Sequence, residues 1–357
     1  MNIFLTGGTG YFGHELALEL ARRGYTVKLL TRDIDSHYIP KHPNVFPVQG
    51  DLMDKESLVE GTKACDSIFH AGAAVALYGK TRTEVYEVNV NGTINLLEAA
   101  VVNKIRRFVF TSSCATIGST IKHALHEDSP RMTSFGDDYA LSKFVAEQWI
   151  QKYAEKGLHA VIVNASKIFG PGINRGTIST NSQIERFLSG KLCLVPTPGT
   201  YQAGYVFIGD LIDGHLKAWE KGQTGNRYII NSANMSMDEI YNAFREVSGK
   251  KGTILRIPQW LGVAAGHLHY VTMRAIGKVP LYSGRDMNLI YTNKIYDTKK
   301  AQTELGFKPA PFMDTLKTTI DFLNEKRQTR LKRYHEPAMP IYPQAEKTEI
   351  PFNKLHT

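Results

Sequence analysis

A tyrosine and a lysine four residues apart, Tyr139 and Lys143, could carry acid–base chemistry. The residues that follow them continue a helical pattern, and side chains at this spacing lie on one face of a helix. A free phenol titrates near pH 10, so it exchanges a proton at neutral pH only when a nearby cation favours the phenolate. Lys143 can be that cation, although the same pair is also common on ordinary helix surfaces.

A glycine-rich turn lies at the N-terminus, far from this pair in sequence. The apolar run at residues 3–5 predicts a buried β-strand, and Gly7, Gly10 and Gly13 follow it with the spacing G-x-x-G-x-x-G before a helix expected near residue 14. Without Cβ atoms the backbone can turn tightly and approach a pyrophosphate, whose charge then lies at the helix N-terminus. The same glycines can also serve a tight turn alone.

A third group of polar side chains ends an apolar strand between these two motifs. The run Arg107-Phe-Val-Phe-Thr-Ser-Ser113 places hydroxyls where an α/β sheet presents its carboxyl edge to a ligand. Such a hydroxyl could orient a substrate oxygen. Ser113 is favoured over Ser112 for this role, and their adjacency leaves both open.

Strands and helices alternate through the first half of the chain. Expected strands are 3–5, 27–30, 67–70, 108–111 and 160–164, and expected helices are 14–23, 54–60, 84–103 and 139–156. This order predicts an α/β fold with a Rossmann-type doubly wound parallel sheet.

Prolines and glycines interrupt the pattern after residue 170, which predicts a smaller C-terminal substrate lobe. The dinucleotide-binding domain is expected to comprise 1–170 with 205–222 returning to it. The lobe would then comprise 171–204 and 223–325, and a basic, proline-rich tail 326–357. Within the lobe, residues 235–248 predict an amphipathic helix. Ser236 is its expected N-cap, and Glu239, three residues later, completes the capping-box pattern.

Composition limits the class of protein. The chain has 357 residues, 42% of them hydrophobic, and no uninterrupted apolar run of the roughly 18 residues that a membrane span needs. We therefore expect a cytoplasmic protein with no integral membrane segment. Its net charge of +9 comes without a nucleic-acid-binding motif, so no nucleic-acid partner is expected. Cys65, Cys114 and Cys193 are scattered, which argues against disulfides and a zinc site and predicts buried apolar residues.

Taken together, the glycine turn, the hydroxyl-ended strand and Tyr139-Ala-Leu-Ser-Lys143 resemble the extended short-chain dehydrogenase/reductase superfamily, from residue 1 to about 325. Dihydroflavonol reductases, 3β-hydroxysteroid dehydrogenases and hopanoid-associated epimerase-like proteins form the most similar branch, and these mostly handle apolar ketones and alcohols. Further motifs in the family's order are Asp51-Leu52, His70-Ala-Gly-Ala-Ala74, Asn89-Val-Asn-Gly-Thr93, Asn164-Ala-Ser-Lys-Ile-Phe-Gly-Pro-Gly172 and Tyr296-Asp-Thr-Lys-Lys-Ala-Gln-Thr-Glu-Leu-Gly306.

The resemblance implies hydride transfer between a nicotinamide and a carbonyl or secondary alcohol carbon, with no metal. Tyr139 would be the general acid or base, Lys143 would lower the pKa of Tyr139 and hold the nicotinamide ribose, and Ser113 would bind the substrate oxygen. His70 would form part of the wall. The implied cofactor-binding residues are Gly7, Thr9, Gly10, Tyr11, Phe12, Gly13, Thr31, Arg32, Asp51, Leu52, Ala71, Gly72, Ala73, Asn89, Ser112, Tyr139, Lys143 and Ser166.

The end of the second strand bears on the choice of cofactor. Thr31 lacks the charge that would repel a 2′-phosphate, and Arg32 could bind one, which favours NADP. Asp33 could still bind the ribose hydroxyls, so NAD stays open. Asp51 matches the family residue that contacts adenine, and it could equally cap the helix before Lys55.

Apolar side chains recur at helical spacing in residues 258–291. They could pack on the core of the lobe. In the family, however, this region caps the nicotinamide end of the cleft, which favours a medium-sized apolar carbonyl or alcohol substrate.

Two other functions stay open. A nucleotide-sugar epimerase is disfavoured because such enzymes usually keep an acid where Thr31 stands. A non-catalytic dinucleotide-binding redox sensor is disfavoured because Ser113, Tyr139 and Lys143 are all present. The resemblance also implies a homodimer through the helices near 84–103 and 139–156.

Overall fold

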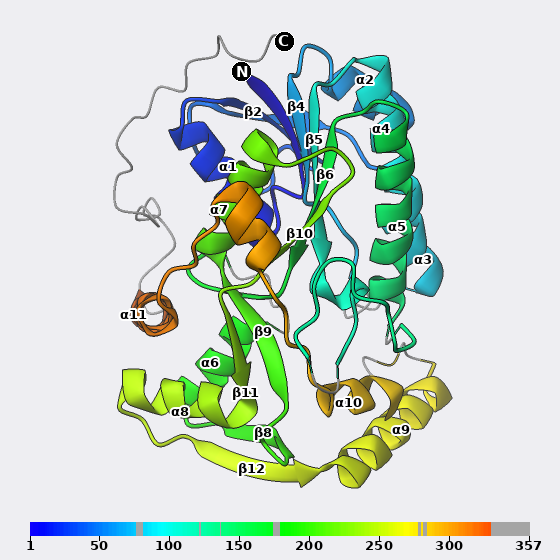
Figure 1. The fold of residues 1–357 in the computed structure, drawn as a ribbon. Coiled ribbons are helices and arrows are strands. Elements are labelled where there is room, and N and C mark those ends of the chain that lie inside the picture. Colours follow the sequence, from blue (N-terminus) through cyan, green and yellow to red (C-terminus); the bar gives the residue numbers. More distant parts are fainter. Residues whose placement is uncertain are drawn as a thin grey trace.

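A seven-stranded parallel sheet in the order β10-β6-β5-β4-β1-β2-β3 forms the centre of the molecule (Figure 1). The computed structural model describes residues 1–75, 81–120, 123–135, 137–173, 179–277, 280 and 284–329. The order confirms the Rossmann-type sheet. Its strands are β1 (Asn2–Thr6), β2 (Thr26–Thr31), β3 (Val45–Gln49), β4 (Ser67–His70), β5 (Arg107–Ser113), β6 (Ala160–Ala165) and β10 (Arg227–Ile230).

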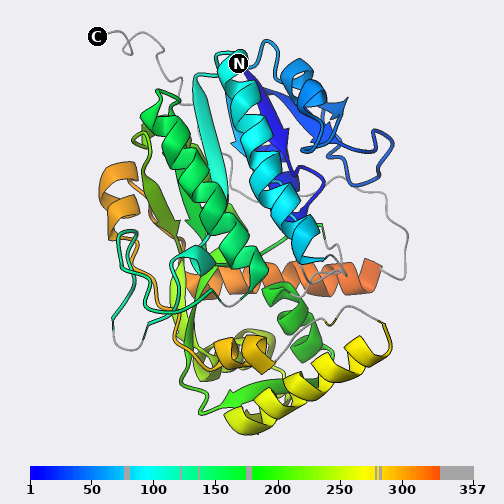
Figure 2. The ribbon, with the colours of Figure 1, turned by 90° about the vertical axis from the view of Figure 1, so that its right-hand side faces the viewer.

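Helices cover both faces of this sheet (Figures 1 and 2). On one face lie α1 (Tyr11–Arg22) and α7 (Ile208–Lys221), and on the other lie α2 (Lys55–Gly61), α4 (Gly92–Val102) and α5 (Asp138–Glu155). Because each face packs against an apolar core, the central strands read as continuous apolar runs. The edge strand β3 was not expected, since most of its side chains are exposed and it contains Pro47.

The helix expected at 84–103 is divided. The structure has α3 (Arg82–Tyr86), a π-helical turn (Glu87–Asn91) and then α4. Asn89 lies inside the π-helical turn, which is buried at this residue. Such turns are frequent at functional sites.

The C-terminal lobe carries two small sheets, β11-β9-β7 and β12-β8. The predicted capping box of Ser236 and Glu239 is present at the start of α8.

The chain segment that returns to the dinucleotide domain is longer than expected. Because β10 pairs with β6, it extends to Ile230, beyond the expected residue 222. The elements of the lobe are β7 (Lys167–Phe169), α6 (Thr180–Leu188), β8 (Leu192–Thr197), β9 (Gln202–Phe207), β11 (Ala233–Ser236), α8 (Met237–Ser248), β12 (Thr253–Pro258), α9 (Gln259–Ala275), α10 (Gly284–Ile290) and α11 (Phe312–Thr329).

Several expectations from composition can be compared with the described residues. All three cysteines are free and buried, as predicted. No described group of His, Cys, Asp or Glu side chains could hold a metal ion. Likewise, no helix within the described ranges has the length and apolar character needed to cross a bilayer. Most of the predicted tail, residues 330–357, lies outside the described residues.

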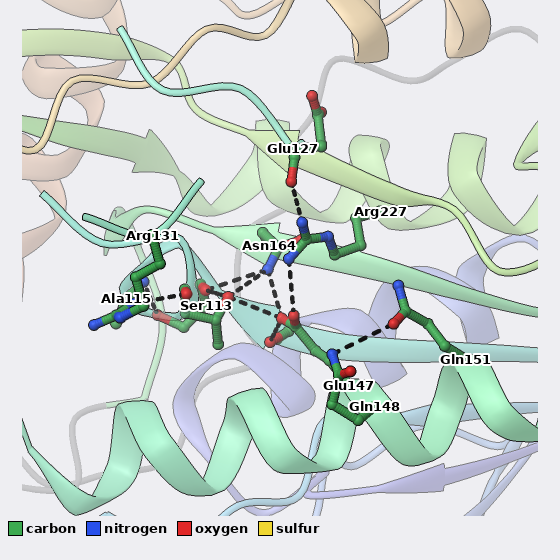
Figure 3. A network of polar contacts seen from close by, with 11 residues as sticks. Ser113, Ala115, Glu127, Arg131, Glu147, Gln148, Gln151, Asn164 and Arg227 are labelled. Atoms are coloured by element: carbon green, nitrogen blue, oxygen red, sulfur yellow. Dashed lines mark hydrogen bonds and ion pairs between the residues drawn. The ribbon is translucent and has the colours of Figure 1, made fainter. Parts of the chain in front are cut away.

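One buried carboxylate ties the sheet to α5 (Figure 3). Glu147 is fully buried, and its Oε1 accepts hydrogen bonds from Ser112 Oγ, from Thr116 Oγ1 at 2.9 Å and from Asn164 Nδ2 at 2.7 Å. Arg227 Nη1 lies 3.3 Å from its Oε2. The carboxylate therefore joins α5 to β5, β6, β10 and the turn that follows β5.

The turn after β5 is also held from its other side (Figure 3). Arg131 Nη1 donates to the carbonyl oxygens of Ala115 and Thr116, at 2.9 and 2.7 Å. Arg227, besides pairing with Glu147, donates to the carbonyl oxygen of Glu127. Together these contacts fix the backbone next to the hydroxyl-ended strand.

We predict that Glu147→Ala lowers the free energy of unfolding by about 3 to 5 kcal/mol, because it leaves the buried donors Ser112, Thr116 and Asn164 without their acceptor and the half-buried Arg227 without its counter-charge. Urea denaturation followed by circular dichroism measures the change. Asp321→Ala is the control, since it removes an exposed ion pair with Lys317 on α11 and should leave the midpoint unchanged. Equal midpoints for the two variants would contradict the structural role of Glu147.

Candidate active site

The turn between β1 and α1 packs backbone against backbone on the segment after β4. Gly7 has a φ of +76°, and a Cβ there would lie 2.6 Å from backbone atoms of Ala71 and Gly72. A Cβ on Gly13 would lie 2.2 Å from the Gly7 carbonyl oxygen. Both glycines are therefore required by sterics in this structure.

The start of α1 suits an anion. Its N-cap is Gly10, no side chain caps the N–H groups, and its first turn contains no acid. The neighbouring side chains point elsewhere, since Tyr11 Oη donates to the Gly170 carbonyl at 2.7 Å and Phe12 is buried. Tyr11 and Phe12 thus offer their backbone to a ligand at this turn, and Thr9 precedes the N-cap residue Gly10. These features fit the pyrophosphate of a dinucleotide.

A buried chain of hydrogen bonds fixes the floor beside this turn. Gly72 N–H donates to Thr6 Oγ1 at 3.0 Å, and Thr6 Oγ1 lies 2.7 Å from His70 Nδ1. His70 Nε2 lies 2.9 Å from Thr93 Oγ1, which itself donates to the Asn89 carbonyl. The hydrogen of the imidazole is therefore on Nε2. Burial lowers the pKa of His70 well below its usual value, so the ring is neutral and structural.

Asn89 joins this floor to α5. Its side chain accepts from Ala74 N–H at 2.7 Å and donates to the Ala74 carbonyl and to Ser142 Oγ, both at 2.9 Å. Ser142 precedes Lys143, so Asn89 positions the helix that carries the candidate catalytic pair. Leu52 is buried, and its side chain lies next to Gly72. In the segment after β4, Ala71 is half-buried, Gly72 is buried and Ala73 is exposed.

At the adenosine end, Thr31 and Arg32 follow β2. Thr31 Oγ1 donates to the Asp33 carbonyl at 2.8 Å. The Arg32 side chain is 78% exposed, and its Nε lies 3.8 Å from Asp51 Oδ2. Asp51 does not cap α2; that alternative is wrong, because the N-cap is Asp54.

The candidate catalytic pair lies on the first turns of α5. The Lys143 ammonium lies over the ring of Phe110 on β5, 3.8 Å from its centroid. Desolvation, with a smaller contribution from Asp137, raises the pKa of Tyr139 to about 12, and desolvation lowers the pKa of Lys143 to about 7. The side chains alone do not produce the lowered tyrosine pKa that the resemblance implied. The phenol is protonated at neutral pH.

A cavity of about 220 Å³ opens beside the end of β5. Ser113, Ser166 and Ala140 line it, whereas Tyr139 and Lys143 are not among its described lining residues. Tyr139 precedes Ala140 on α5. Ser112 points to the opposite side and donates its hydrogen to Glu147, so only its backbone is left for a ligand. The Ser166 hydroxyl is buried with no hydrogen-bond partner among the described residues.

The cavity is more cationic than the sequence led us to expect. Arg131, Lys167 and Lys294 line it, and Asp137 is the only carboxylate among its described lining residues. Desolvation, reinforced by Lys294, lowers the pKa of Lys167 to about 8. Both lysines were missed; Lys167 lies within a recognised motif, but only the fold brings Lys294 beside it.

None of the described residues of the apolar segment 258–291 lines this cavity. Helix α9, which makes up most of its described residues, buries only Gly266. The expectation that its side chains wall the described cavity is therefore wrong. Residues 278–279 and 281–283 lie outside the described residues.

Comparisons with known proteins agree with the fold and the motifs. Residues 3–231 match the model of the NAD dependent epimerase/dehydratase family. A Synechocystis protein named "Putative dihydroflavonol 4-reductase" is 30% identical over 323 residues, covering 89% of this chain and 93% of its own. A 3 beta-hydroxysteroid dehydrogenase/Delta 5-->4-isomerase of Mycobacterium tuberculosis is 27% identical over 86% of each chain.

Among solved structures, gox2253 superposes with a TM-score of 0.78 and 26% identity, covering 91% of this chain and 98% of its own. The relatives are named as reductases and dehydrogenases, in accord with the chemistry that the site's residue types can support. This chain is an enzyme that belongs to the NAD dependent epimerase/dehydratase family, the extended short-chain dehydrogenase/reductases.

Proposed function

We propose that the protein is an NADP(H)-dependent oxidoreductase that reduces a ketone on a lipophilic molecule, or oxidises the corresponding secondary alcohol. The observation that carries the proposal is the position of Ser113 on a cavity whose wall continues into the first turn of α5, where Tyr139 is protonated at neutral pH. A protonated phenol is the form that can donate to an alkoxide, which suits the reductive direction.

When bound, a nicotinamide dinucleotide supplies the hydride for the carbonyl carbon. Tyr139 donates a proton to the carbonyl oxygen as negative charge develops there. Ser113 Oγ accepts a hydrogen bond from Ala115 N–H at 3.1 Å, so its own hydrogen is directed elsewhere and can bind the same oxygen. Lys143, whose ammonium lies over Phe110, would hold the ribose of the nicotinamide.

The preference for NADP rests on Arg32. Its guanidinium is largely exposed, and its 3.8 Å ion pair with Asp51 is long. It can therefore turn to a 2′-phosphate at little cost, while Thr31 adds no negative charge nearby.

The cations of the cavity bear on the substrate. Relatives with steroid names suggest a lipophilic molecule. Lys167 and Lys294, with the unpartnered Arg131 Nε, favour a molecule that also carries an anionic substituent, such as a carboxylate, near its ketone. The same cations favour a second candidate function, epimerisation of a nucleotide sugar, whose pyrophosphate they could bind.

Tyr139→Phe should lower kcat for ketone reduction on the order of a hundredfold to ten-thousandfold and leave NADPH affinity nearly unchanged, because it removes only the proton donor. Stopped-flow absorbance and a fluorescence titration of NADPH measure the two effects. Tyr153→Phe on the same helix is the matched control and should keep full activity. Undiminished turnover in Tyr139→Phe would refute the assignment.

Wild-type protein should bind NADPH about tenfold to a hundredfold more tightly than NADH, the effect of one or two charge-assisted hydrogen bonds. Arg32→Ala should remove this preference with little change in NADH affinity. Arg245→Ala, on α8 in the lobe, is the control. A wild type that favours NADH would instead assign Asp33 to the ribose.

Lys294→Gln should raise KM for a ketone bearing a carboxylate by roughly tenfold to a hundredfold, and should leave KM for its methyl ester unchanged. Lys299→Gln, on the surface, is the control. The assay follows NADPH consumption for both substrates, with a UDP-sugar in parallel. Equal effects on acid and ester would rule out a contact with the carboxylate, and epimerisation without net cofactor consumption would establish the second candidate.

A further inference from the structure

Helix α9 exposes an apolar stripe at the end of the lobe farthest from the central sheet (Figures 1 and 2). Trp260 is 71% exposed, Leu268 66% and Val271 61%. At about 100° per residue, these side chains and Leu261 fall within one sector of the helix. The one buried residue, Gly266, is on the opposite side. The helix thus contacts the protein through its small residues and presents its large apolar side chains to the outside.

The adjoining sheet also exposes apolar side chains. Leu194 on β8 and Leu255 on β12 are register partners, and both are exposed. Strand β12 leads directly into α9. We call the exposed apolar side chains of α9 and of this sheet the α9 face; its members are Leu194, Leu255, Trp260, Leu261, Leu268, Tyr270, Val271 and Ile276. Exposed apolar side chains gathered in this way usually mark an interaction site.

The stretch of chain that carries α9 and β12 has charged residues of one sign. Residues 247–285 contain no aspartate or glutamate. Among the described cations, Arg274 is on the last turn of α9, while Lys250 and Lys251 precede β12. Arg256 is paired with Asp238 at 2.6 Å. The cations of this stretch are Lys250, Lys251, Arg256, Arg274, Lys278 and Arg285.

This charge decides between the partners that could cover the face. A symmetric pair of chains would place the same cations opposite one another, and like charges across an interface are costly. Insertion across a bilayer is not supported, because no described helix is long and apolar enough. An anionic lipid bilayer offers negative headgroups to the cations and an apolar interior to the side chains of the stripe. Aromatic residues such as Trp260 and Tyr270 favour the headgroup level of a bilayer.

We propose that the α9 face binds the surface of an anionic lipid bilayer, with α9 lying in the interface plane. The apolar stripe enters the boundary between headgroups and acyl chains, while Arg274 and Lys251 contact the lipid phosphates. Lys250 is held back from this role, because its ammonium donates to the Leu188 carbonyl at 2.7 Å. This inference does not depend on the proposed reaction, since it uses no residue of the cavity.

Sedimentation of the full chain with vesicles tests the proposal. Vesicles of phosphatidylcholine mixed with phosphatidylglycerol should carry the protein down, vesicles of phosphatidylcholine alone much less, and added salt should release it. The double variant Leu268→Glu/Val271→Glu should lower partitioning at least tenfold, because each buried side chain contributes roughly tenfold. Val101→Glu/Val102→Glu is the matched control, since these valines are also exposed but lie at the end of α4.

Failure of the wild type to sediment with anionic vesicles, or equal sedimentation of both double variants, would overturn the proposal. Light scattering adds a further arm: a dimer that Leu268→Glu/Val271→Glu dissociates, without vesicle binding, would assign the face to a second copy of the chain. Activity in solution serves to check folding, because the variants leave Ser113, Tyr139 and Lys143 untouched.

Discussion

Glu147 is two helical steps of four residues beyond Tyr139, with Lys143 between them, so all three side chains share the face of α5 that meets β5. The carboxylate is buried, and it accepts hydrogen bonds from β5, β6 and the following turn while pairing with Arg227 on β10. These bonds fix the position of α5 along the sheet and its rotation about its own axis. The position of Tyr139 relative to Ser113 depends on them, together with the contact of the Lys143 ammonium with Phe110 on β5.

Desolvation acts in opposite directions on the two candidate catalytic groups. It raises the pKa of Tyr139 and lowers that of Lys143, so each side chain tends toward its neutral form. The phenol then holds its proton at neutral pH, ready for donation. The neutral His70, tied to Thr6 and Thr93, adds no charge to the floor below. The protonated phenol is the form that the proposed reduction requires, while the proposed alcohol oxidation would need a lower tyrosine pKa than the side chains provide.

Much of this arrangement could be read from the sequence where a pattern had one physical cause. The central strands are buried on both faces, and Gly7 and Gly13 are required by backbone contacts, so both were predictable. The alternation of a strand explains why Ser113 faces the cavity while Ser112 faces Glu147. The edge strand β3 was missed because most of its side chains are exposed, so it lacks the apolar pattern of a buried strand. The π-helical turn at Asn89 was missed because it changes the helical periodicity only locally. Lys167 and Lys294 meet only through tertiary structure. The periodicity of α9 predicted an apolar face, but it could not show that this face is exposed instead of packed against the protein.

The pH dependence of ketone reduction in single turnovers tests the central claim, that Tyr139 is the proton donor. With NADPH saturating, the rate for the wild type should stay level around neutral pH and fall only as the pH rises toward about 12, the pKa of Tyr139, because the phenolate has no proton to give. Tyr139→Phe should react slowly and without this decline. A decline at high pH that persists unchanged in Tyr139→Phe would show that another group donates the proton.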